Sequence, residues 1–168
     1  MALPTTNGSG NKIGAALATQ GLLTDVDTVQ RNVLGTLSWD DLGNAHVYLP
    51  GVASCIIGSW CTYVLGTYVP ALTITTSIPG GLVAVANGAI LATNWGWFQV
   101  FGYVPVASIA TATITVGQPL YASSTAGRAT TTAAGAATLF GAFTGATSAS
   151  NLGTAMLSFP FLCATSTL

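Results

Sequence analysis

Few side chains in this sequence could do acid–base or nucleophilic chemistry. The chain has one histidine and four acidic residues, all of them aspartate. Two carboxylate pairs are close enough in sequence for acid–base catalysis, Asp25 with Asp27 and Asp40 with Asp41. Asp40 and Asp41 would point to opposite faces of a strand, because successive side chains alternate. The other pair lies in a segment where burial and pKa tuning are difficult. We expect these aspartates to be solvated turn and cap residues.

Nucleophilic or metal chemistry would have to use His46 and the cysteines. A Cys–His nucleophile needs His46 beside Cys55 or Cys61 and a third orienting group, and the local sequence carries no protease signature. The CxxC and HxxxH spacings of zinc sites are absent. No glycine-rich segment has the lysine that a phosphate loop requires. We therefore expect no catalytic, cofactor-binding or metal-binding residues, and we predict that the protein is not an enzyme.

Charged side chains are unusually scarce. Asp, Glu, Lys and Arg make up 4% of the 168 residues, against about 25% in an ordinary soluble domain. After Asp41, Arg128 is the only residue with a formal charge. A basic patch for nucleic acid is therefore absent. A surface with so little charge and a net charge of −1 favours association, so we expect neighbouring subunits to cover part of it.

The charge-free stretch from Val52 to Thr75 is long enough to cross a bilayer. It contains Gly58, Gly66 and Pro70, polar residues recur along it, and no Lys/Arg cluster flanks it. The first residues lack the apolar segment behind a basic start that marks an export signal. We expect no membrane partner and synthesis in the cytoplasm.

Short strands are the elements that would have to position any site. Residues 1–34 have no strong periodic face and are expected to form an extended N-terminal arm, while residues 35–168 form a β-rich body. Frequent turn signals predict an all-β fold, a small β-barrel or β-sandwich of short antiparallel strands. The expected strands are 47–49, 59–69, 73–77, 82–86, 95–104, 109–116, 120–122, 129–132, 138–144 and 154–159.

The segment 95–104 gives the strongest strand signal and is rich in aromatic residues. On a strand, Trp97, Phe101 and Tyr103 share one face. Two main interpretations stay open: the rings form core, or one face lies in a subunit interface, where Trp and Tyr are enriched. An exposed platform for sugar stacking is a third. The candidate interface residues are Trp95, Trp97, Phe101, Tyr103 and Arg128.

Several motifs resemble a pattern found in the tailed-bacteriophage capsid decoration (cement) protein family. They are YLPGVAS at 48–54, GSWCTY at 58–63, NWGWFQVFG at 94–102, PLYASSTAGR at 119–128 and FPF at 159–161. These motifs are structural and bring no catalytic residue with them. The resemblance implies a β-rich body that binds the major capsid protein on the capsid exterior of the virion. It also implies a homo-oligomer at a symmetry axis, with a trimer favoured.

The leading hypothesis is therefore a structural virion protein that binds the outer surface of a phage capsid and cements capsomers. A protein that binds only the assembled capsid lattice stabilises that lattice by mass action. The N-terminal arm could reach a neighbouring subunit. The alternative is a glycan- or receptor-binding module on the virion surface that uses Trp95 and Trp97. A membrane-associated pore is a third hypothesis.

Overall fold

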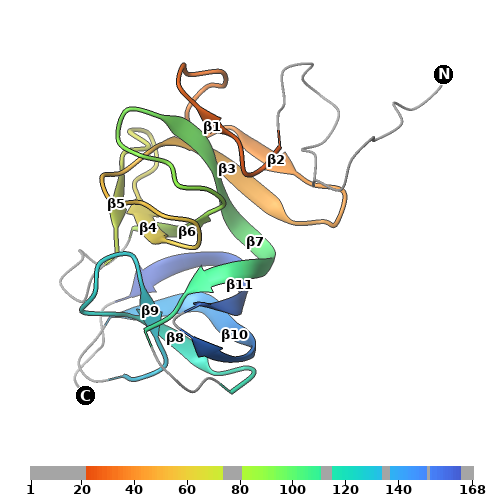
Figure 1. Cartoon of the computed structure of the whole chain (residues 1–168), viewed down its shortest axis with the longest axis vertical. Helices are drawn as coiled ribbons and strands as arrows, with labels where there is room; N and C mark the ends of the chain where they lie inside the picture. Colours follow the sequence, from red (N-terminus) through yellow and green to blue (C-terminus); the bar gives the residue numbers. More distant parts are fainter. Residues whose placement is uncertain (1–21, 74–80, 111–114, 134–136, 151, 164–168) are drawn as a thin grey trace.

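The computed structural model describes residues 22–73, 81–110, 115–133, 137–150 and 152–163. Within these ranges every regular element is a strand, and the strands form one 11-stranded antiparallel sheet that does not close on itself (Figure 1). The expected all-β fold is confirmed, in a sandwich-like form. No helix that could cross a membrane occurs in the part of the chain described. The strands are β1 (Val26–Asp27), β2 (Leu37–Trp39), β3 (Ala45–Pro50), β4 (Trp60–Tyr63), β5 (Pro70–Leu72), β6 (Leu82–Ala86), β7 (Trp95–Ser108), β8 (Pro119–Ala122), β9 (Ala129–Thr130), β10 (Thr138–Ser150) and β11 (Leu152–Cys163).

Strand β7 runs through both halves of the molecule and bends between them (Figure 1). Its first part pairs with β3 and β6 in the upper half of the figure, and its second part pairs with β11 in the lower half. At the bend, Gly102 has a φ of +91°, a conformation that glycine adopts without steric cost. A Cβ atom at this position would lie 2.0 Å from Oδ1 of Asn44. The bend therefore requires glycine.

Each half has an apolar core. The upper core contains Val47, Leu49 and Phe98, with further residues of β4 and β6. The lower core contains Leu120 and Leu139, together with side chains of β7 and β11. Trp60 of β4 is fully buried and belongs to this lower core, as do two valines of β6. Strands β4 and β6 thus contribute side chains to both cores, and β7 runs through both halves.

Residues 22–34, the described part of the expected arm, pack against the upper half. Leu23 is buried beside Tyr48, whose hydroxyl donates a hydrogen bond of 2.7 Å to the carboxylate of Asp27. Strand β1 pairs with the start of β7. Residues 1–21 lie outside the described residues, so the arm and its boundary remain predictions.

Some strand boundaries agree with the sequence and others do not. Strands β6, β7 and β10 begin at the expected residues. The expected strand 59–69 is too long, because β4 ends at Tyr63 and the chain turns through Gly66 and Tyr68, with φ of 93° and 52°. Most of the expected strand 73–77, and the middle of 109–116, lie outside the described residues.

Candidate functional site

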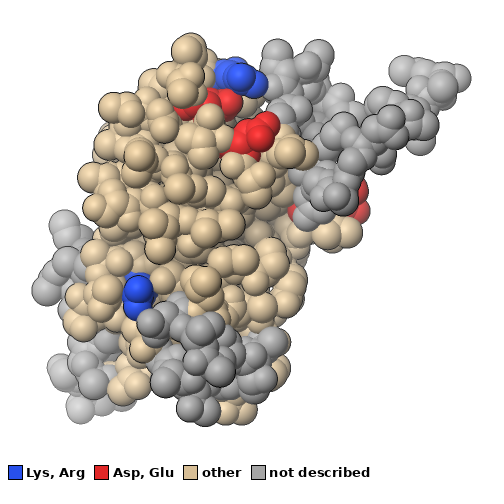
Figure 2. Space-filling model, in the orientation of Figure 1, with Lys and Arg blue, Asp and Glu red and all other residues tan. Residues whose placement is uncertain are grey.

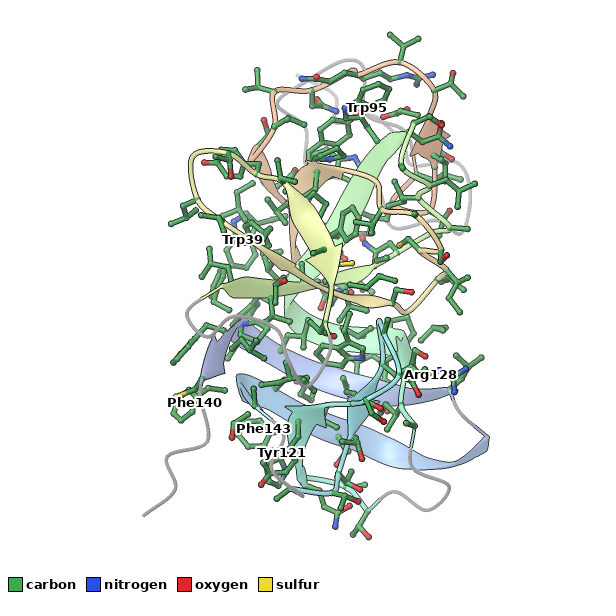
Figure 3. All side chains as sticks on the ribbon, turned by 90° about the vertical axis from the view of Figure 1, so that its left-hand side faces the viewer. Trp39, Trp95, Tyr121, Arg128, Phe140 and Phe143 are labelled. Atoms are coloured by element: carbon green, nitrogen blue, oxygen red, sulfur yellow. The ribbon has the colours of Figure 1, made fainter. Side chains whose placement is uncertain are left out.

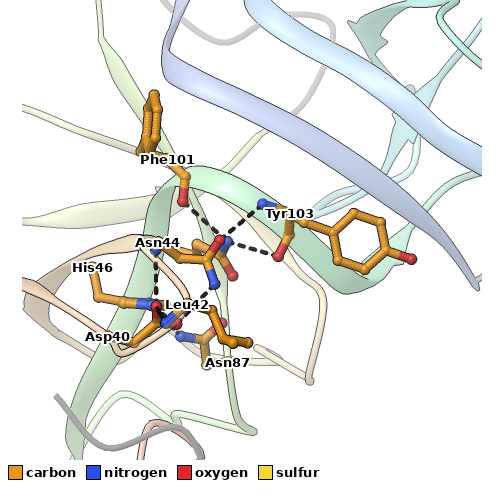
Figure 4. Close-up of polar contacts among 8 residues, drawn as sticks. Asp40, Leu42, Asn44, His46, Asn87, Phe101 and Tyr103 are labelled. Carbon is orange, nitrogen blue, oxygen red and sulfur yellow. Dashed lines mark hydrogen bonds and ion pairs between the residues drawn. The ribbon is translucent and has the colours of Figure 1, made fainter.

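A buried polar cluster lies beside the bend of β7 (Figure 4). The carboxylate of Asp40, which follows β2, accepts hydrogen bonds from the backbone N–H groups of Leu42 and Asn44, at 2.9 and 2.8 Å. It also accepts one from the side-chain amide of Asn44, at 2.8 Å, and lies 3.3 Å from Nε2 of His46. Asp40 caps its turn as expected, but the expectation that it is solvated was wrong, because it is 8% exposed.

Both ring nitrogens of His46 are engaged in this cluster. Nδ1 lies 2.9 Å from Nδ2 of Asn87, and Nε2 faces the Asp40 carboxylate. Since the amide NH₂ can only donate, Nδ1 accepts and the ring proton sits on Nε2. Burial lowers the pKa of His46 below its ordinary value, although the hydrogen bond and charge of Asp40 act in the opposite direction. The neutral ring has no nitrogen free to take a proton from a substrate.

The Asp40 carboxylate stays ionised inside the cluster. Burial raises its pKa, but the hydrogen bonds from Asn44, His46 and Leu42 together outweigh burial and hold the pKa below its usual value. A carboxylate held by several donors is stabilised in its charged form. The cluster therefore fixes the turn between β2 and β3 against the bend of β7.

We expect the free energy of unfolding to decrease in two steps as the pH falls. His46 has a lowered pKa in the folded state, so its contribution is complete above its unfolded pKa of about 6.5 and is lost below that pH. Asp40 also has a lowered folded pKa, so its contribution is lost below about pH 3.9. Urea denaturation between pH 8 and 3 measures both steps. His46 is the only histidine, so His46→Gln should remove the first step. An unaltered chain whose free energy of unfolding does not change from pH 8 to 5 would contradict the prediction.

A pocket of about 340 Å³ opens beside the polar cluster. His46, Asn87 and Gln99 provide polar lining, and Leu22 and Ile57 are among its apolar lining. None of the described residues that line it is a serine, cysteine or lysine. The part of the chain described also holds no group of three side chains suited to a metal ion. The described lining of the pocket thus offers no serine or cysteine nucleophile that His46 could serve.

The structure places the five expected interface residues in three different parts of the molecule. Trp97 is 2% exposed and packs in the upper half, where Trp95 lies half-buried against the same cluster. Arg128 lies on the lower half, far from Trp95 and on the opposite side from the phenylalanines labelled in Figure 3. Phe101 and Tyr103 lie on either side of the bend of β7 at Gly102, and their rings point in different directions (Figure 4).

Phe101 and Tyr103 belong to a larger apolar surface on β2, β7, β10 and β11. Within it, Tyr103 of β7 pairs with Met156 of β11, which pairs with Phe143 of β10. These three side chains are all exposed, and cross-strand neighbours on one sheet face contact each other. We call this surface the aromatic face; it comprises Trp39, Phe101, Tyr103, Phe140, Phe143, Met156, Phe159 and Phe161.

Ring contacts order the rest of the aromatic face. The ring centroids of Trp39 and Phe101 are 5.6 Å apart, and those of Phe101 and Phe159 are 5.4 Å apart. Phe140 and Phe161, paired across β10 and β11, have centroids 5.1 Å apart. Pairs at such distances contribute about 0.5–1.5 kcal/mol beyond the burial of their area. The rings therefore hold one another in place although they are exposed.

Backbone irregularities turn several of these rings outward. The register between β10 and β11 shifts between Phe140 and Ala142, where Gly141 has a φ of +83°. Strict alternation would place Phe140 and Phe143 on opposite faces, but both are exposed beside this shift. Phe159 has a φ of +45°, a left-handed conformation that costs a residue other than glycine about 1–2 kcal/mol. No pattern in the sequence signals these irregularities, so the face was missed beyond Phe101 and Tyr103.

None of the eight described side chains that make up the aromatic face carries a charge. On the side of the molecule shown in Figure 2, the few described charges gather mainly at the upper end, with one basic side chain lower down. Arg31 is paired with Asp27 at 3.1 Å. Two aspartates follow Trp39 directly in the chain; Asp40 is buried in the polar cluster, and Asp41 is exposed in the turn. The face itself is therefore apolar and uncharged.

Comparison with known proteins identifies one family. The family model described as "Phage cement protein" matches residues 63–157. This segment includes β7, β10 and half of β11, and so carries much of the aromatic face. Searches of curated proteins and of solved structures gave no match.

Proposed function

This chain belongs to the phage cement protein family, and from that membership we propose that it binds the outer surface of an assembled phage capsid and cements neighbouring capsomers. The observation that carries the proposal is the family match over residues 63–157, more than half of the chain. Ligands that bind only the assembled state stabilise it, by about 2.7 kcal/mol per site at a hundredfold excess over Kd. A cement protein can act in this way without any reaction.

The chemistry of the described residues supports a structural role. Both nitrogens of His46 are hydrogen-bonded, and Asp40 is held by the turn that it caps. The aromatic face is an exposed apolar surface on which seven described side chains are exposed by 39% or more. Stable protein interfaces need buried area and complementary shape, which such a surface supplies.

The proposal includes two partners, the major capsid protein and further copies of this chain in a homo-oligomer, for which a trimer is favoured. Exposed aliphatic side chains away from the aromatic face favour self-association: Val29, Val33, Leu65 and Val69 are each exposed by at least 65%. The protein would lie on the capsid exterior after synthesis in the host cytoplasm, without nucleic-acid or membrane partners.

The glycan-binding alternative has less support than the cementing role. It requires Trp95 and Trp97 to form a platform on which sugars stack. Trp97 is buried, and its ring packs edge-on against Tyr48 at a centroid distance of 5.1 Å. Its ring is therefore not accessible to a sugar in the folded chain.

Co-sedimentation with purified capsids tests the proposed function. We expect the full chain to pellet with assembled capsids, to stay in solution with unassembled capsid protein, and to raise the temperature at which capsids open. Deletion of residues 1–21 should leave the body folded, because Leu23 and the residues after it, which pack on the upper half, are retained. Native mass spectrometry of the free chain gives the oligomeric state. A folded chain that never pellets with capsids would refute the proposal.

A further inference from the structure

We infer that the aromatic face is the surface that contacts the capsid. We also infer that the complementary surface on the major capsid protein, which we call the seat, is apolar and uncharged. The inference rests on the proposed function and adds the location of the contact and the chemistry of the partner. It concerns β2, β7, β10 and β11, the strands that carry the exposed rings (Figure 3).

The exposed area of the face suits one protein contact. Large aromatic side chains offer about 150–250 Å² each, and seven members of the face are exposed by between 39% (Phe161) and 60% (Phe140). The face therefore presents roughly 600 Å² of apolar surface. Apolar patches of about this size are often functional on soluble proteins. With an equal area on the partner, the contact reaches about 1,200 Å², the lower end of stable interfaces.

The absence of charge on the face determines the chemistry of the seat. A charged side chain of the capsid protein placed against these rings would lose its water without gaining an opposite charge. The only polar side-chain atoms among the members of the face are the Tyr103 hydroxyl and the Trp39 indole N–H, and the backbone of β7, β10 and β11 is paired within the sheet. The complementary surface is therefore apolar, and screening by salt should have little effect on the contact.

The strained backbone at Phe159 is an independent sign of function. Its φ of +45° holds the ring against Trp39 and Phe101 while leaving it exposed. A glycine would adopt this conformation without strain. Strain of this kind clusters at functional sites, and here it maintains an outward-facing ring.

Three features favour the capsid protein over a second copy as the occupant. The chain is a cement protein by family, and the matched segment supplies β7 and β10. If copies of the chain associated through this face, the face would already be buried when the protein reached the capsid lattice. Other exposed aliphatic side chains remain for contacts between copies, including Leu65 and Val69 in the turn after β4, and Val33 before β2.

Affinity for capsids at two salt concentrations tests the inference. Phe143→Asp places a charge on the face at a side chain that is 45% exposed, and Val69→Asp makes a similar change at a 65% exposed site outside it. We expect Phe143→Asp to raise Kd for capsids by about 100-fold or more, as hot-spot changes do, and Val69→Asp to change it by less than about threefold. The Kd of the unaltered chain should change by less than about threefold between 50 and 500 mM NaCl.

A second pair of variants separates binding from folding. Phe159→Gly and Phe159→Ala both remove the ring, but glycine relieves the left-handed backbone. We expect Phe159→Gly to melt at a higher temperature than Phe159→Ala, while both bind capsids equally weakly.

The outcomes distinguish this inference from the proposed function. An unaltered chain that does not bind capsids refutes the proposed function. An unaltered chain that binds, with Phe143→Asp binding equally well, refutes the inference alone. Binding that weakens steeply with salt shows a charged seat and also overturns it. If Phe143→Asp converts the free chain from an oligomer to a monomer without lowering its affinity for capsids, the face is assigned to self-association instead.

Discussion

Replacing Asp40 with alanine should lower the free energy of unfolding by about 4 kcal/mol. The carboxylate accepts hydrogen bonds from two backbone N–H groups, from the Asn44 amide and from His46. Alanine would leave these donors without an acceptor in a buried site. Removing one partner of such a network lowers the free energy of unfolding by more than the net contribution of its hydrogen bonds, because the remaining polar groups stay buried without a partner. Urea denaturation of the purified variant measures the loss.

Asp41→Ala is the matched control for this change. The two aspartates are adjacent, but Asp41 is exposed whereas Asp40 is buried. We expect Asp41→Ala to stay within about 0.5 kcal/mol of the unaltered chain. Equal effects of the two substitutions would show that the buried cluster does not stabilise the fold.

Gly102→Ala should destabilise the chain by about 3 kcal/mol. Its φ of +91° alone costs a residue with a Cβ atom about 1–2 kcal/mol. The new Cβ would lie 2.0 Å from Oδ1 of Asn44, which accepts a hydrogen bond of 3.0 Å from the N–H of Tyr103. Moving this amide would also disturb its bond to Asp40. Thermal and urea unfolding both report the change.

Gly117→Ala separates the two contributions. Gly117 has a φ of +79°, close to that of Gly102, but an added Cβ would meet nothing within 4 Å. We expect this control to lose about 1 kcal/mol, the backbone contribution alone. If both variants lost the same amount, the contact with Asn44 would not contribute to the effect at Gly102.

Sequence patterns predicted the strands well wherever strands alternate regularly. The strand at 82–86 has the predicted bounds, and the strong aromatic segment begins β7 at Trp95 as expected. The sequence also predicted correctly that the fold is all-β and that the family is that of phage cement proteins. Strand β2 was not predicted, because its three residues are too few to show a period.

The aromatic face was harder to predict, because it depends on broken alternation. Phe140 and Phe143 are three residues apart, so a regular strand would send one ring inward. The bulge at Gly141 makes both face outward. The same limit applies to Phe159, whose left-handed backbone is unusual for a bulky residue. Register shifts arise from pairing between distant strands, and local composition does not encode them.

The buried polar cluster was missed for a related reason. Asp40 and His46 are six residues apart in sequence, and the partner of Nδ1 of His46, Asn87, lies on a distant loop. The sequence predicted that the aspartates are solvated turn and cap residues. In the structure, the pairing of β2 with β3, and of β3 with β7, encloses Asp40 and His46. Burial of a polar side chain follows from tertiary contacts that spacing alone does not show.

The position of β11 in the sheet has a consequence for synthesis on the ribosome. This strand pairs with β6, β7 and β10, and it contributes Leu157 and Leu162 to the lower core. Until residues 152–163 have left the exit tunnel, β7 and β10 lack a shared neighbour and the nascent lower half stays open. At about 5–20 residues per second, adding this strand takes on the order of one second. A ribosome stalled before β11 would thus hold a chain whose unpaired strands are open to aggregation or to a chaperone.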